Sequence, residues 1–360
     1  MGWCVLRTAN RFLQYAQGLD IIVEMCFFNC QYENQWPYSP LHVDANIQGV
    51  GDCDYHTCQT LDNEALVREQ LRYIEKLMLE TNRFDNIIYE FVDEPTLFLV
   101  PSYKAYGWIN ALVSKAVAVE EPLPKKHMLA QQLEIGVDFA CDDRLSLIVT
   151  QYIQMGARQV GGVPALNNVY CYSKPIELNE TAYVPAWVSR DLVSISRLES
   201  WEFMVGGGAG FNQLNGFFVP SNPAGENETN KQILQGLKNL RAFLENMDYI
   251  RMTRDRETVT KVSIGANLNM ISEKGRQYAL YMHHSFPNHG VFAGSFYEPN
   301  YGEYEPVLTL CLTAGDYTVT FVEPKTMKEL GTGRITSAGG EVQLACPKYE
   351  LDIAIVIHSE

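Results

Sequence analysis

A chain of 360 residues is long enough to hold one large domain and a smaller one. Its 28 basic and 43 acidic side chains give a net charge of −15, which argues against nucleic acid or an anionic membrane as a partner. No apolar run is long enough to span a membrane, and no signal peptide opens the chain. Residues 1–17 resemble the middle of an amphipathic helix, so we expect an upstream segment in the parent protein, which leaves export of that protein open.

Helices and apolar strands alternate through the first part of the chain. After the helix that Gly18 closes, residues 21–28 form an almost continuous apolar run, typical of a strand covered on both faces. A long loop of polar and aromatic residues follows to about residue 60, and loops of this length are usually functional. The helical apolar period over 61–81 then predicts a helix before a strand over 86–93.

The same alternation continues towards residue 250. It predicts helices over 102–119, 191–205 and 229–247, and strands over 126–132, 145–152, 173–180 and 210–218. Such alternation indicates a parallel α/β fold with right-handed crossovers. The sequence has neither Gly-x-Gly-x-x-Gly nor a Walker loop, which favours a barrel over a nucleotide-binding sheet.

The pattern changes at about residue 256. Short alternating strands separated by Gly, Pro and Asn turns follow, and they predict an all-β sandwich. We therefore predict two domains, a β/α barrel over 1–255 and a β-sandwich over 256–360.

Two adjacent carboxylates end one of the predicted strands. The β-rich run of residues 86–92 stops at Asp93, Glu94 and Pro95, because proline has no N–H to continue the ladder. In a parallel barrel, active-site groups lie at the carboxyl ends of the strands. Acids at such a position are costly to bury unless they are used or paired. A solvated strand end with a turn-forming proline fits this segment alone equally well.

A second strand delivers a carboxylate in the same way. The strand predicted over 173–180 ends at Glu180, and strand ends three units apart lie across the mouth of a parallel barrel. Two carboxylates that face each other across a pocket are the minimum equipment for hydrolysing a glycosidic bond. One of them must be protonated to assist the leaving oxygen, and the other must be ionised to attack or to activate water.

Three segments resemble clan A glycoside hydrolases, the retaining (β/α)8-barrel enzymes that include the cellulase-like families. Residues 88–95 resemble the end of the fourth strand of that clan, where Asn-Glu-Pro carries the general acid/base. Residues 174–181 resemble the seventh strand, which ends in the nucleophilic glutamate, and the glycine-rich residues 201–214 are similar to the segment between helix seven and strand eight. The C-terminal strands resemble the accessory sandwiches attached to such barrels.

The resemblance implies retaining hydrolysis of O-glycosidic bonds in a poly- or oligosaccharide, with Glu94 as general acid/base and Glu180 as nucleophile. Asp93 replaces the asparagine of the clan; an ionised aspartate cannot donate, and its charge helps to keep Glu94 protonated. If residues 86–93 and 21–28 are strands four and three, the first two units are absent. The expected fold is thus an N-terminally incomplete (β/α)8 TIM-type barrel of about six strands with two unpaired edges, plus a β-sandwich.

Other polar and aromatic side chains at the strand ends and in the long loop are candidates for contact with the sugar. At the strand ends they are Asp93, Gln132, Glu134, Tyr152, Asn179, Asn212 and Asn215. In the loop, Trp36, Tyr38 and His42 are candidates for a stacking wall. Structural interpretations stay open beside these roles: a core cap for Tyr152, solvation for Gln132, and turn chemistry for Asn212. Glu90 and Glu177 lie inside their strands, and we interpret them as structural acids that face the helix layer.

We expect carbohydrate as the partner and no cofactor, because two carboxylates complete the chemistry. The nine cysteines lack metal-ligand spacing, and we interpret them as free or buried thiols, with a Cys53–Cys58 bridge as the alternative in an exported protein. A non-catalytic carbohydrate-binding remnant, inactive through truncation, is the alternative function. A metal-dependent hydrolase barrel is disfavoured, because no His-x-His ends an early strand.

Overall fold

The computed structural model describes residues 3–96, 100–134, 136–151, 153–154, 157–158, 160–180, 191–212, 221–289 and 295–360. The chain divides into two compact units. The first unit holds Met1–Thr150, Gln154–Gly156 and Tyr172–Pro175, and the second holds Gln151–Ile153, Ala157–Cys171 and Ile176–Glu360. These units group the chain differently from the domains 1–255 and 256–360, which stay a prediction.

A parallel sheet forms the centre of the first unit. Its strands are β1 (Val23–Asn29), β2 (Ile87–Asp93), β3 (Met128–Gln132) and β4 (Leu147–Gln151), and they pair in this order. Buried apolar residues occupy successive positions of these strands, such as Phe27 and Phe28 of β1 and Ile148 and Val149 of β4, as expected for a sheet covered on both faces. The carboxyl ends of these strands therefore lie along one edge of the sheet.

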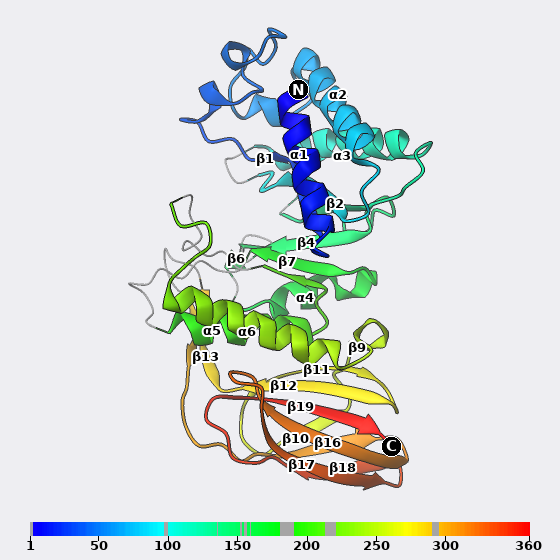
Figure 1. Cartoon of the computed structure of the whole chain (residues 1–360), viewed down its shortest axis with the longest axis vertical. Helices are drawn as coiled ribbons and strands as arrows, with labels where there is room; N and C mark the ends of the chain where they lie inside the picture. The colour runs from blue at the N-terminus through cyan, green and yellow to red at the C-terminus, as the bar shows by residue number, and fades with distance from the viewer. Residues whose placement is uncertain are drawn as a thin grey trace. The chain divides into compact units, whose positions relative to one another are not determined.

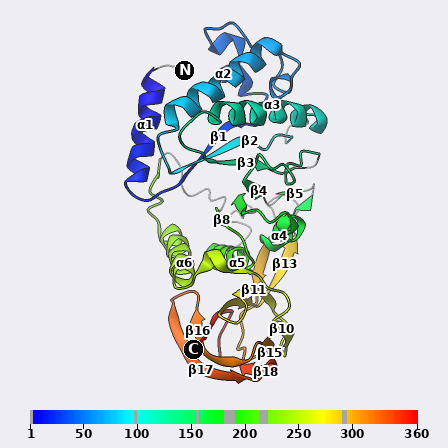
Figure 2. The ribbon, with the colours of Figure 1, turned by 90° about the vertical axis from the view of Figure 1, so that its right-hand side faces the viewer.

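Three helices belong to this unit, and all three were predicted from the sequence. They are α1 (Trp3–Gln17), α2 (Glu64–Thr81) and α3 (Ser102–Glu120). The side chain of Asn63 caps α2 by accepting from the N–H of Leu66. Figure 2 shows α2 and α3 side by side over β1, β2 and β3. Tyr73 of α2 contacts Phe27 and Phe28 of β1, which joins the helices to the sheet.

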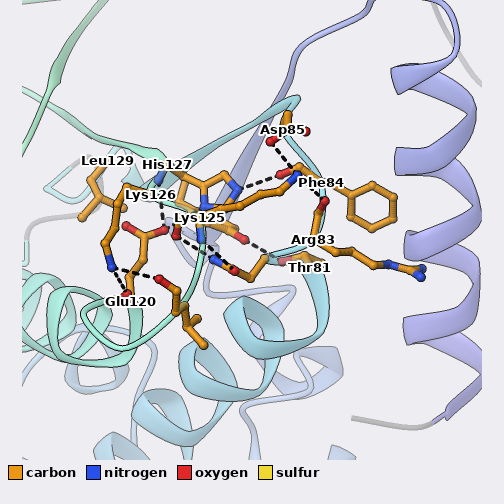
Figure 3. Close-up of polar contacts among 12 residues, drawn as sticks. Thr81, Arg83, Phe84, Asp85, Glu120, Lys125, Lys126, His127 and Leu129 are labelled. Atoms are coloured by element: carbon orange, nitrogen blue, oxygen red, sulfur yellow. Dashed lines mark hydrogen bonds and ion pairs between the residues drawn. The ribbon is translucent and has the colours of Figure 1, made fainter.

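The loops at the amino end of the sheet are joined by a buried histidine (Figure 3). Nδ1 of His127 lies 2.7 Å from Oε1 of Glu120, at the end of α3, and Nε2 lies 2.8 Å from the carbonyl oxygen of Phe84. Lys125 adds an ion pair of 2.6 Å to Asp85. Since an ionised Glu120 and the carbonyl oxygen of Phe84 are both acceptors, this arrangement favours the imidazolium form, which can donate from both nitrogens, and the pKa of His127 is raised.

Parallel strands and helices of the barrel type also belong to the second unit. Strand β7 (Ile176–Glu180) pairs in parallel with β8 (Gly210–Phe211). The helices are α4 (Val163–Val169), α5 (Leu192–Val205) and α6 (Glu228–Glu245). The predicted strand over 210–218 is confirmed at its start only, because residues 213–220 lie outside the described residues.

The rest of the second unit consists of antiparallel sheets. One has three strands in the order β10-β15-β18 and another has six in the order β17-β16-β19-β12-β11-β9, while β13 and β14 form a pair. Their bounds are β9 (Thr253–Arg254), β10 (Val259–Val262), β11 (Asn267–Glu273), β12 (Gln277–His283), β13 (Ser285–His289), β14 (Ser295–Pro299), β15 (Val307–Leu312), β16 (Gly315–Glu323), β17 (Lys328–Ser337), β18 (Gly340–Ala345) and β19 (Asp352–Ser359). The sandwich predicted after residue 256 is confirmed.

Two apolar clusters hold this unit together. Leu280, Leu308 and Ile355 belong to the cluster between the two larger sheets. Trp201 of α5 and Phe243 of α6 belong to the other, in which the helices pack on the outer face of the six-stranded sheet. Figure 1 shows α5 and α6 running side by side along β11 and β12. None of the described helices is long and apolar enough to cross a membrane.

Candidate active site

The predicted acid pair lies at the carboxyl end of β2. Asp93 is the last residue of the strand and pairs with Asn29 of β1. Its carbonyl oxygen accepts from the N–H of Cys30, 3.1 Å away. Glu94 follows with a φ of +49°, in the left-handed region that few residues other than glycine adopt. A carboxylate held in strained backbone at a strand end is typical of a functional position.

Side chains at the end of β3 hold this backbone in place. Oε1 of Gln132 accepts from the N–H of Glu94 at 2.9 Å. The amide of Gln131 bonds the main chain of Val92 twice, to the N–H at 3.2 Å and to the carbonyl oxygen at 2.9 Å. Gln132 has no exposed surface. Its contacts are with the chain itself, so the structure argues against the predicted bond from Gln132 to substrate and makes it a positioning residue for Glu94.

Glu134 fixes the turn that follows Glu94. Its Oε2 accepts from the N–H of Thr96 at 2.8 Å and also from the hydroxyl of that threonine. Burial raises the pKa of Glu134, although both bonds to Thr96 oppose this shift. From the sequence, Glu134 is a candidate contact for the sugar, with surface solvation as the alternative; the structure places it half-buried beside the candidate acid.

The surroundings of Glu94 favour its protonated form. Burial, followed by the charge of Asp93, raises the pKa of Glu94 to about 7. Glu134 adds to this rise, and a hydrogen bond from the thiol of Cys30 opposes it. Burial also raises the pKa of Asp93. A carboxyl group with a pKa near 7 can donate a proton at neutral pH and accept it back, as general acid/base catalysis requires.

The position of Glu90 contradicts the interpretation that this acid faces the helix layer. It lies in β2 next to Tyr89, whose hydroxyl contacts Oγ1 of Thr81 in α2 at 2.6 Å. Because successive side chains of a strand point to opposite faces, Glu90 points away from the helix layer, not towards it. It is buried beside Cys26 of β1, and burial together with Glu90 raises the pKa of that thiol. The sequence could not show which face of β2 Glu90 lies on, because apolar residues occupy both faces of this strand.

The second predicted acid belongs to the second unit. Glu180 ends β7, and its Oε2 accepts from Nε2 of Gln151 at 3.0 Å. Next to it, Oδ1 of Asn179 is buried and has no hydrogen-bond partner among the described residues. Asn212 is exposed, and its N–H donates to the carbonyl oxygen of Leu178 at 2.8 Å, which extends the pairing of β7 and β8. Glu177 lies against Gly210 of β8.

The glycine-rich turn between α5 and β8 has a steric cause. Gly207 has a φ of +101°, and a Cβ on Gly208 would lie 2.2 Å from the ring of Phe203. The turn thus needs residues without side chains if β8 is to pair with β7. The segment that carries part of the family resemblance is therefore also a packing requirement of this strand pair.

The aromatic residues of the long loop differ in exposure. Trp36 is 5% exposed, donates from its indole to the carbonyl oxygen of Cys53 at 2.7 Å and packs on Cys58. This burial argues against Trp36 as a sugar-stacking surface, because its rings form the core of the loop. Tyr38 is 83% exposed and keeps a free ring face. Tyr152 lies outside the described residues.

Two further predictions concern cysteines and metals. Cys53 and Cys58 are free thiols, as are the other cysteines whose side chains the structure describes. The alternative of a Cys53–Cys58 bridge is therefore wrong for this structure. In the described part of the chain, no group of three or more His, Cys, Asp or Glu side chains could hold a metal ion.

Comparison with known proteins finds similar solved structures. No family model and no curated protein matches this sequence. A solved structure titled "Glycoside hydrolase" superposes with a TM-score of 0.60 at 11% identity, covering 99% of this chain and 89% of the other. A glycoside hydrolase family 5 protein from Bacteroides vulgatus superposes with a TM-score of 0.56 at 11% identity, covering 82% of this chain and 68% of the other. A γ-CGTase from alkalophilic Bacillus clarkii superposes with a TM-score of 0.54 at 12% identity, covering 99% of this chain and 56% of the other.

At sequence identities of 11 to 12%, these superpositions show a shared fold. The chain has the fold of glycoside hydrolases: part of a TIM barrel with six parallel strands, and an antiparallel sandwich.

Proposed function

We propose that this protein is a retaining glycoside hydrolase that cleaves O-glycosidic bonds of a poly- or oligosaccharide. The observation that carries the proposal is the environment of Glu94. Burial and the neighbouring Asp93 hold its pKa at about 7, and the chain fixes it in left-handed backbone at a strand end. The structural neighbours support the class of enzyme, because several are glycoside hydrolases.

In the proposed first step, Glu94 protonates the leaving oxygen while the carboxylate of Glu180 attacks the anomeric carbon. The glycosidic C–O bond breaks, an ester forms to Glu180, and the leaving group departs as an alcohol. In the second step Glu94 removes a proton from water, which attacks the same carbon and releases Glu180. This mechanism requires the two carboxyl groups to approach to roughly 5–5.5 Å.

Two positioning groups support these roles. Gln132 fixes the N–H of Glu94, and Nε2 of Gln151 donates to Oε2 of Glu180, which orients that carboxyl group. Opposite protonation states of the two acids are what a retaining mechanism needs at its start.

The test is a screen of β- and α-linked aryl glycosides and polysaccharides with wild type, Glu94→Gln and Glu180→Gln. Glu80→Gln, which alters a partly exposed acid of α2 paired with Lys76, is the matched control. We expect loss of at least about a hundredfold in kcat for each site variant and no change in the control. The anomer released first, read by NMR, should keep the configuration of the substrate. Equal turnover in the two site variants and wild type would remove both acids from the mechanism, and an inverted product would exclude retention.

The alternative is a protein that binds carbohydrate without turnover. Asp93 favours it, because this residue stands where the resemblance expects an asparagine that can also donate to the sugar. Binding of a polysaccharide by wild type, without release of reducing ends from any substrate in the screen, would support this alternative.

A further inference from the structure

A small pocket in the second unit contains two arginines. Its volume is about 270 Å³, and it is formed by β9, the start of β10, the segment between them and β11, together with Val163 of α4. Arg254, Asp255, Arg256 and Asn269 are its polar lining groups. A pocket of this size is smaller than the sites of drug-sized ligands, so it suits a single chemical unit such as one monosaccharide or one phosphate.

Neither arginine has a carboxylate within ion-pair distance among the described residues. The guanidinium of Arg254 lies over the ring of Tyr170, 5.9 Å from its centre. Arg256 donates to the side-chain oxygen of Asn167, a neutral group. In contrast, Arg251 at the preceding turn pairs with Asp248 at 3.0 Å. Two cations that share a pocket in a chain of net charge −15 are therefore left with neutral partners.

The acids nearby form no ion pair with either guanidinium, although Oε2 of Glu202 is buried without a hydrogen-bond partner among the described residues. Oδ1 of Asp255 accepts from two N–H groups of its own turn, and Oδ2 accepts from the hydroxyls of Thr258 at 2.7 Å and Ser272 at 2.6 Å. Glu202 lies behind the pocket wall, where its Oε1 accepts from the hydroxyl of Tyr297 at 2.8 Å and from Asn269 at 3.4 Å. These carboxylates moderate the positive charge without forming an ion pair to either guanidinium.

The surroundings of Arg254 disfavour its charge. Burial, and then repulsion by Arg256, lowers the pKa of Arg254 to about 10, against the weaker opposing effects of Tyr170 and Glu202. An anion in the pocket would relieve this repulsion, because a guanidinium binds an oxyanion through two parallel N–H donors.

We propose that this pocket binds a small oxyanion, either the carboxylate of an acidic monosaccharide or a phosphate group. Arg254 and Arg256 provide the charge-assisted donors, and the amide of Asn269 adds a neutral polar contact. The apolar residues of β11 and α4 form the walls. This site is separate from the chemistry of Glu94, so the proposal stands whether or not the chain hydrolyses glycosides.

The test is calorimetric titration of the full chain with glucuronate, inorganic phosphate and, as the neutral control, glucose. We expect glucuronate or phosphate to bind in the micromolar to low millimolar range, more weakly as salt is raised, and glucose not to bind. Binding of glucuronate alone identifies an acidic sugar, and binding of phosphate alone identifies a phosphate group. If neither anion binds at up to about 10 mM, the proposal is wrong.

The variants locate the binding. Arg254→Gln should weaken it at least about tenfold, and Arg256→Gln, at an exposed position, should weaken it several-fold. Arg251→Gln removes an arginine of the adjacent turn and should leave binding unchanged, as should Glu94→Gln. A thermal unfolding scan checks that each variant is folded. Binding that survives both Arg254→Gln and Arg256→Gln would place the anion elsewhere and overturn the proposal.

Discussion

The thiol of Cys30 donates to Oε2 of Glu94, with 3.6 Å between the two atoms. The bond reaches from the residue after β1 to the residue after β2, so neighbouring strand ends meet at the candidate acid. It stabilises the ionised carboxylate, whereas burial and Asp93 favour the protonated form. The pKa of Glu94, about 7, therefore reflects a balance between neighbours that can be changed one at a time.

Removing the charge of Asp93 should lower the pKa of Glu94. In Asp93→Asn the like charge is gone, so Glu94 ionises more readily and loses its proton at lower pH. Since the general acid must be protonated, we expect the basic limb of the kcat/KM profile to move down by about half a unit to one unit. Asp85→Asn, at an exposed acid just before β2, is the control and should leave the profile unchanged. A limb that stays in place or moves up would contradict the role of Asp93.

Removing the thiol of Cys30 should act in the opposite direction. Cys30→Ala deletes a donor to the ionised form of Glu94, so the pKa of Glu94 should rise and the basic limb should move up by a few tenths of a unit. The measurement is the same pH–rate profile, and Cys311→Ala, at an exposed thiol of the second unit, is the matched control. A downward shift would show that water entering the space outweighs the lost bond.

The left-handed backbone at Glu94 makes a prediction about stability. Glycine adopts a φ of +49° without steric strain, whereas a residue with a Cβ is strained by about 1–2 kcal/mol. We therefore expect Glu94→Gly to be more stable than Glu94→Ala by about 1 kcal/mol, the reverse of the order in an ordinary strand. Urea unfolding of both variants measures this difference, and both lack the carboxyl group, so the comparison isolates the backbone. Equal stability, or a more stable alanine variant, would remove strain as a feature of this site.

The order of helices and strands could be predicted because burial on one or both faces leaves a periodic apolar pattern. The helix over 64–81 and the strand over 87–93 match their predicted ranges closely for this reason. The glutamines that hold the end of β2 could not be predicted, because Gln131 reaches Val92 and Gln132 reaches Glu94 from the next strand, and glutamine carries no periodic signal. The sequence shows that Trp36 lies in a loop, but it cannot show that the loop folds over its own indole.

The buried ion pair between α5 and the sandwich should be important for stability. Arg197 is 5% exposed and Asp352 is 4% exposed, and Nε of Arg197 lies 2.8 Å from Oδ2 of Asp352. The same oxygen also accepts from the hydroxyl of Tyr281 at 2.9 Å. Arg197→Met leaves Asp352 buried without its counter-charge, so we expect a loss of about 3–5 kcal/mol. Arg241→Met breaks an exposed pair with Glu245 on α6 and should cost at most about 0.5 kcal/mol. Chemical unfolding of both variants tests the contrast, and similar losses would contradict it.

His127 should make the first unit less stable as pH rises. Burial alone lowers the pKa of His127, but its bonds to Glu120 and to the carbonyl oxygen of Phe84 outweigh burial, and the net shift is upward. A raised histidine pKa means that the folded chain binds the proton more tightly than the unfolded chain. The stabilisation is therefore complete below the unfolded pKa, about 6.5, and is lost as pH rises through the folded pKa.

The comparison of wild type with His127→Gln tests this linkage. We expect the difference in unfolding free energy to be about 1–3 kcal/mol at pH 5.5 and to shrink on going to alkaline pH, because only the imidazolium donates from both nitrogens. His358→Gln in the second unit is a control of opposite sign, since burial lowers the pKa of His358 and its contribution is lost as pH falls. A difference for His127→Gln that is constant with pH would mean that the ring is held in its neutral form.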